Sequence, residues 1–87
     1  MNQIKYIIHR YEPYGNPISG KLIAFLIINT DNDHVEYVDT ILSLSEYEGL
    51  SDPEICSLAF TKLKDQIDLL TENLLNRTKL IGSEFVP

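Results

Sequence analysis

Hydrophobic and polar residues alternate with a period of two along the first half of the chain, a pattern typical of β-strands. Residues 3–12 alternate apolar with more polar side chains, and residues 34–44 do so again after the polar turn 31–33. Between them, residues 21–30 are apolar at both sets of positions, which favours a strand at the centre of a sheet, covered on both faces. Because Pro and Gly residues interrupt segment 13–20, the order of strands and turns predicts an antiparallel meander.

The second half of the chain has a helical period. Ser51 and Glu54 have the spacing of a capping box, and Pro53 fits the first helical turn, where its missing N–H costs no hydrogen bond. Apolar residues then recur at steps of three and four, as in an amphipathic helix; they are Ile55, Leu58, Ala59, Leu63, Ile67, Leu70 and Leu74. A second Ser-x-x-Glu pattern, at Ser45 and Glu48, predicts a short helical turn before this helix.

These patterns predict an α+β fold in a single domain, since 87 residues are fewer than two domains require. We expect the three-stranded antiparallel meander in residues 1–44, the short turn helix in 45–50, and one long amphipathic helix in 51–77, packed on one face of the sheet. Residues 78–87 follow as a tail, for which the pattern leaves open a docked and a free arrangement.

One helix covers only one face of a sheet, yet the predicted central strand is apolar on both faces. The second face would then show more large apolar side chains than a monomer usually exposes. Either the C-terminal tail folds back over this face or a second subunit covers it, and we favour a homodimer.

The sequence contains no pattern typical of a catalytic or cofactor site. His9 and His34 are far apart along the chain and are interpreted as strand residues near turns. Cys56 is the single cysteine, which excludes an intramolecular disulfide, and it is either a small apolar filler or a reactive thiol near a helix start. Residues 31–33 resemble the start of a calcium loop, but the later Gly and Glu of that loop are missing.

We therefore predict a non-enzymatic protein with no catalytic residues, no cofactor and no metal. The longest apolar run, residues 22–28, is much shorter than the ~20 residues of a membrane helix. We expect a cytoplasmic protein that does not bind a membrane.

Acidic residues dominate the middle of the chain. Thirteen Asp and Glu against seven Lys and Arg give a net charge of −6, the wrong sign for direct binding to nucleic acid. Residues 22–61 contain no Lys or Arg, and their acids are Asp31, Asp33, Glu36, Asp39, Glu46, Glu48, Asp52 and Glu54. Two interpretations stay open: a solvated surface that keeps a small protein soluble, or an acidic ridge addressed to a basic partner. Both require the acids to lie on one side of the molecule.

Tyr47 lies between Glu46 and Glu48, directly before Gly49. An aromatic ring flanked by charges can anchor an interface while the carboxylates steer the partner's approach. The alternative is that the Tyr47 ring folds onto the sheet as an ordinary half-buried aromatic.

Three segments together resemble a known family. Residues 42–48 read Leu-Ser-Leu-Ser-Glu-Tyr-Glu and precede a helix that opens with acidic residues. They follow Val-Glu-Tyr at 35–37 and the Asp-rich turn 31–33. This arrangement resembles the small dimeric phage inhibitors of uracil-DNA glycosylase.

The resemblance implies a dimer that mimics DNA. Tyr47 would enter the hydrophobic pocket with which the enzyme grips DNA, and Glu36, Glu46 and Glu48 would take the place of phosphates or orient the ring. This chain departs from the family in carrying Tyr where the family has Phe, since the hydroxyl would need a partner in an apolar pocket. It also has one extra residue between the Glu36 segment and Leu42, and an additional first strand.

The sequence hypothesis is thus a phage or mobile-element inhibitor of a host DNA-binding enzyme, with uracil-DNA glycosylase as the candidate partner. Its steering carboxylates would be Asp31, Asp33, Glu36, Asp39, Glu46 and Glu48, with Tyr47 as the anchor. One alternative is an assembly or accessory protein that binds through its apolar sheet face, with the acids serving only solubility. The other is an enzyme subunit or regulator that uses Cys56.

Overall fold

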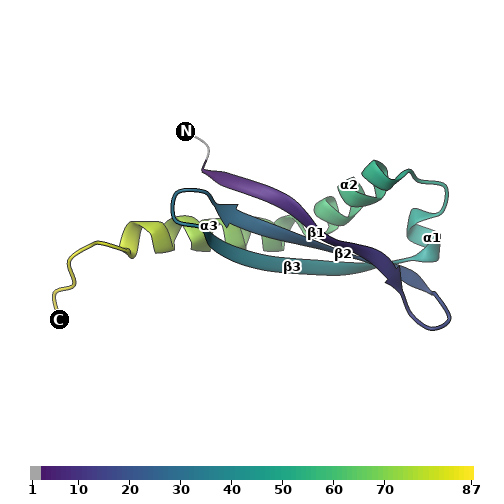
Figure 1. The fold of residues 1–87 in the computed structure, drawn as a ribbon, viewed down its shortest axis with the longest axis horizontal. Coiled ribbons are helices and arrows are strands. Elements are labelled where there is room, and N and C mark those ends of the chain that lie inside the picture. The colour runs from purple at the N-terminus through teal and green to yellow at the C-terminus, as the bar shows by residue number, and fades with distance from the viewer. Residues whose placement is uncertain (1–2) are drawn as a thin grey trace.

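The computed structural model describes residues 3–87, which form one three-stranded antiparallel sheet followed by helices (Figure 1). The strands are β1 (Ile4–Tyr14), β2 (Gly20–Asn29) and β3 (His34–Ser43), in the spatial order β1-β2-β3. The helices are α1 (Leu44–Tyr47), α2 (Asp52–Lys62) and α3 (Lys64–Leu80). The predicted α+β fold and the central position of the apolar strand are confirmed.

Strand β1 continues two residues beyond its predicted end. Pro13 pairs with Lys21 of β2. A proline is tolerated here because β1 is an edge strand, with no further strand on its other side to need the missing N–H. The register also shifts between Ile8 and Arg10, so His9 forms a bulge. This shift puts Tyr11 on the same face of the sheet as Ile8.

One face of the sheet packs against the helices and forms the core. Along β2 the side chains of Ile23, Phe25 and Ile27 point to this face and are almost fully buried. They meet Val38 and Leu42 of β3, and the helices contribute Ile55, Ala59, Leu63, Ile67 and Leu74. Figure 1 shows α3 beside the half of the sheet that ends at the turn between β2 and β3, and then continuing beyond that end. The buried apolar area of this one interface is what stabilises the domain.

The structure corrects the prediction of one long helix over residues 51–77. The helical segment is divided at Leu63, which ends α2 and precedes α3, and α3 continues to Leu80. Ile55, Ala59, Leu63 and Ile67 are spaced by four residues, and four residues turn a helix by about 400°, so each step moves about 40° around a straight helix. In one straight helix Ile55 and Ile67 would point about 120° apart. The break at Leu63 lets both helices bury these positions.

The C-terminal segment leads away from the sheet. Residues 81–87 contain no helix or strand, and Phe85 and Val86 remain 84% and 79% exposed. Figure 1 shows this segment extending beyond the end of α3. The C-terminal tail therefore does not cover the second face of the sheet, which was one of the two arrangements predicted for that face.

Candidate binding surfaces

Helix α1 brings Glu46, Tyr47 and Glu48 together at the end of β3. The Glu46 carboxylate accepts hydrogen bonds from the backbone N–H of Ser43 at 3.0 Å and from its hydroxyl at 3.1 Å, which fixes the first turn of α1. The capping pair is thus Ser43 and Glu46, two residues earlier than the predicted Ser45 and Glu48. The predicted pair at the start of α2 is confirmed, since Glu54 accepts from the N–H of Ser51 at 3.0 Å.

Glu46 is also bound from the neighbouring helix. Lys62 of α2 donates to the Glu46 carboxylate at 3.0 Å. The backbone hydrogen bond from Ser43, reinforced by Lys62, lowers the pKa of Glu46 to about 2. The charge of Glu46 is therefore used inside the molecule, to hold α1 against α2.

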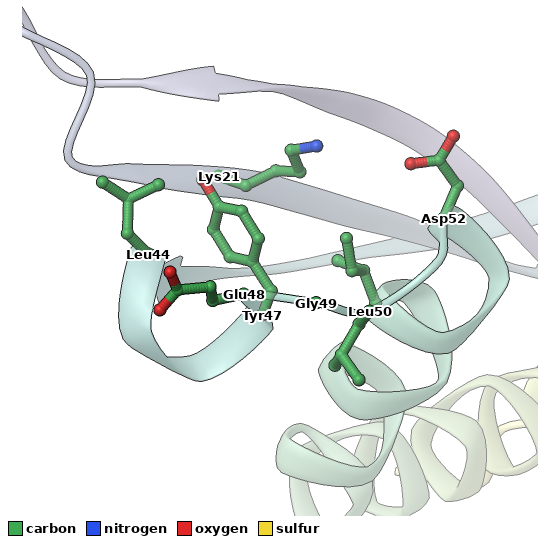
Figure 2. Close-up of a pocket in the computed structure, with 8 residues that line it drawn as sticks. Lys21, Leu44, Tyr47, Glu48, Gly49, Leu50 and Asp52 are labelled. Atoms are coloured by element: carbon green, nitrogen blue, oxygen red, sulfur yellow. The ribbon is translucent and has the colours of Figure 1, made fainter.

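Tyr47 is half-buried and packs against the core. The ammonium of Lys21 lies 5.3 Å from the centroid of the Tyr47 ring and 4.4 Å from that of Tyr11, so the cation is shared between two aromatic faces. Figure 2 shows Lys21 and Tyr47 side by side among the residues that line a pocket of about 420 Å³. This is the half-buried arrangement that the sequence left open. Insertion of the Tyr47 ring into a partner would require it to leave Lys21.

A short hydrogen bond separates this pocket from a second one. The Tyr11 hydroxyl donates to Asp52 at the start of α2, and burial together with this carboxylate raises the pKa of Tyr11 to about 12. Beyond it, Ile8, Pro53 and Cys56 line an apolar pocket of about 380 Å³. Burial raises the pKa of the Cys56 thiol, which disfavours the thiolate form that a reactive cysteine needs.

The remaining acids lie elsewhere. Glu36 faces the helices and forms an ion pair with Arg77 of α3. Asp39, three residues further along β3, points to the opposite face and accepts a hydrogen bond from the Tyr37 hydroxyl at 2.9 Å. Asp31 and Asp33 lie in the turn between β2 and β3, at the other end of the strand from α1. The structure brings Tyr47 and Glu48 together at one pocket, directs Glu46 to Lys62, and separates the other candidates.

A polar cluster that the sequence analysis missed holds the turn between β2 and β3. The hydroxyl oxygen of Thr78 accepts from the side-chain amides of Asn29 at 2.5 Å and Asn32 at 2.9 Å, and its hydroxyl donates to the Leu74 carbonyl at 3.0 Å. Asn29 is fully buried. An Asn at the end of an otherwise apolar central strand is the signal that points to such a partner.

The second face of the sheet, here called the open face, points away from the helices. Its apolar members are Ile7, Leu22, Ala24, Leu26, Ile28, Val35, Tyr37 and Ile41. The outer-strand members Ile7, Val35, Tyr37 and Ile41 are each 42–43% exposed. Within residues 3–87 no helix lies over these side chains, so the molecule presents a largely apolar surface to its surroundings.

The open face carries equal numbers of positive and negative side chains. Arg10 pairs with Glu12, and the pKa of the Arg10 guanidinium is raised by hydrogen bonds to Glu12 and then to Tyr37. Lys5 and Arg10 supply two positive charges, while Glu12 and Asp39 supply two negative charges. The open face is thus close to neutral, whereas the whole chain carries −6.

Comparison with models of known protein families, with curated proteins and with solved structures gave no significant match. The resemblance to the phage inhibitors therefore stays a prediction. Within residues 3–87, no helix has both the length and the apolar character needed to cross a bilayer. No group of three or more His, Cys, Asp and Glu side chains suited to a metal ion occurs in the same range.

Proposed function

We propose that this chain is a small non-enzymatic binding protein that docks on a protein partner through its open face. The observation that carries the proposal is the exposure of Ile7, Val35, Tyr37 and Ile41 on the face of the sheet that no helix of this chain covers within residues 3–87. Apolar side chains gathered on one surface gain free energy when a partner removes them from water. This is the assembly or accessory function that the sequence offered as an alternative to DNA mimicry.

The positions of the acids support the same choice. Glu46 and Glu36 are bound to Lys62 and Arg77. Asp31 and Asp33 lie at the opposite end of the sheet from Glu46. Carboxylates spread over separate places do not form the continuous ridge that a copy of a phosphate backbone needs, whereas each of them still contributes to solubility.

Capture of partners by tagged chains, identified by mass spectrometry, tests the proposal. We expect Leu26→Asp to abolish capture, because it places a charge at the centre of the open face. The matched control is Leu69→Asp, which makes the same change at a helix position that is 58% exposed. Because burial drives the contact, capture by the wild type should persist at high salt. Equal capture by Leu26→Asp and Leu69→Asp would contradict the proposal.

DNA mimicry remains a second candidate because Glu48 and Asp52 both line the pocket beside Tyr47. It predicts inhibition of uracil-DNA glycosylase that weakens steeply as salt is raised, is lost in Tyr47→Ala and is unaffected by Leu26→Asp. Uracil excision assays with purified enzyme measure this directly. An enzyme that remains fully active at low salt with excess protein would eliminate this candidate.

A further inference from the structure

We infer that the partner of the open face is a second copy of this chain, related to the first by a two-fold axis that runs parallel to β2. The inference rests on the proposed function, since it names the occupant of the same surface. The charges of the open face and the register of the three strands support a second copy as this occupant.

The balance of charges on the open face favours a second copy of the chain as its partner. Two chains that each carry −6 repel each other, so a self-contact is favoured only where the facing surfaces are neutral. The open face is such a surface, because Lys5 and Arg10 balance Glu12 and Asp39. A strongly basic partner would gain nothing from this balance, whereas a second copy brings the same two signs with it.

The strand register places opposite charges where a two-fold axis would join them. Arg10, Ala24 and Asp39 are register partners and form one row across β1, β2 and β3. A two-fold axis parallel to β2 exchanges β1 and β3 between the facing sheets. Arg10, which pairs with Glu12 in the single chain, then lies opposite Asp39 of the other copy. Adding this carboxylate to the existing pair, or exchanging it for Glu12, gives two equivalent ion pairs across the interface.

Ala24 lies near the axis in this row and is fully buried within the single chain, so the contact between the copies falls on the side chains around it. Facing sheets pack about 10 Å apart, a gap that an extended Arg and a short Asp together can span.

The neighbouring row supplies apolar contact. Ile7, Leu26 and Tyr37 are register partners, so the same axis sets Ile7 against Tyr37 of the second copy and Leu26 against its own equivalent. Leu26 of both copies would therefore lie in the interface. A single substitution there changes both sides of the contact.

The area of the open face sets the expected strength. Ten-residue strands are about 33 Å long and three strands are about 14 Å wide, so the buried area lies near the lower limit of stable interfaces. We expect a dimer that dissociates in the micromolar range and persists when salt is raised.

Sedimentation equilibrium of the full chain over a range of concentrations tests the inference. The wild type and Leu69→Asp should show a monomer–dimer equilibrium, whereas Leu26→Asp should remain monomeric. Circular dichroism checks that Leu26→Asp keeps its fold, which is expected because Leu26 faces away from the helices.

Charge reversal tests the axis. In Arg10→Asp alone, two acids would face each other across each contact, and in Asp39→Arg alone, two bases would do so. Each variant should dimerise at least about tenfold more weakly than the wild type. An equimolar mixture should form a heterodimer, because each contact of the mixed pair again joins one acid and one base.

The outcomes separate the inference from the function on which it rests. A wild type that stays monomeric at high concentration overturns the self-association, while loss of captured partners in Leu26→Asp would still support the open face as a docking surface for another protein. A wild-type dimer that Leu26→Asp leaves intact overturns the interface. A dimer sensitive to Leu26→Asp whose two charge variants do not recover on mixing overturns the axis.

Discussion

Two neighbouring residues of β2 show the difference between the faces of the sheet. Ile27 is fully buried against the helices, and Leu26, one position earlier, is only partly buried on the open face. Both are large aliphatic residues in the same strand, so the amino-acid type does not separate them. Both faces of β2 were predicted to be covered, and the helices of this chain cover one of them. A strand that is apolar on both faces while one face stays uncovered is the reason for proposing that another molecule supplies the second layer.

The largest expected effect separates these two residues directly. Ile27→Ala should lower the free energy of unfolding by about 2–5 kcal/mol, because it leaves a cavity in the core. Leu26→Ala should cost less than about 1 kcal/mol in the monomer, since its side chain leaves little core contact. Urea unfolding of dilute samples measures both. Equal losses in the two variants would show that the open face is packed within the monomer.

An intermediate effect concerns the contact that holds α2 on the covered face. Tyr11→Phe removes the hydrogen bond to Asp52 and should cost about 1 kcal/mol. The comparison variant is Tyr14→Phe, at a tyrosine that is 46% exposed, which should change stability little.

The same bond predicts a dependence on alkaline pH. Since the pKa of Tyr11 is raised to about 12 in the folded state, its contribution is complete below the unfolded value of about 10 and is lost as pH rises from there through 12. Titration of tyrosine absorbance should show one late-ionising group in the wild type that disappears in Tyr11→Phe. Its persistence in that variant would contradict the assignment.

The smallest effect is expected at the edge of the covered face, where α1 joins α2. The lowered pKa of Glu46, about 2, means that its contribution is present above its ordinary value near 4.5 and is lost as pH falls from there toward 2. Thermal unfolding at pH 6 and pH 3 should therefore show a slightly smaller pH dependence in Glu46→Gln than in the wild type. Asp65→Gln, a change at an exposed carboxylate of α3, serves as a control.

The sequence predicted those parts of the fold that depend on short-range patterns. The three strands and the Ser51–Glu54 cap follow from alternation and local hydrogen bonding. The division of the helix at Leu63 was missed, because a spacing of four is compatible with one helix until the direction of each buried residue is followed along it.

The candidate site was less predictable. The pairing of Glu36 with Arg77 joins residues 41 positions apart, which no local pattern reveals. Likewise, the placement of Tyr47 beside Lys21 depends on how α1 folds against the end of β3. A run of acids in the sequence therefore did not become a ridge in the structure.

The polar cluster that Thr78 forms with the turn between β2 and β3, here called the Thr78 clamp, has a consequence for the order in which the chain folds. It connects Thr78 to Asn29 and Asn32, which are 49 and 46 positions away, so it closes a long loop of chain. Closing such a loop costs entropy that only the assembled sheet and helices repay, whereas the short hairpin of β2 and β3 closes quickly. We therefore expect the clamp to form after the folding transition state. Loss of the Thr78 hydroxyl should speed unfolding while leaving the folding rate almost unchanged.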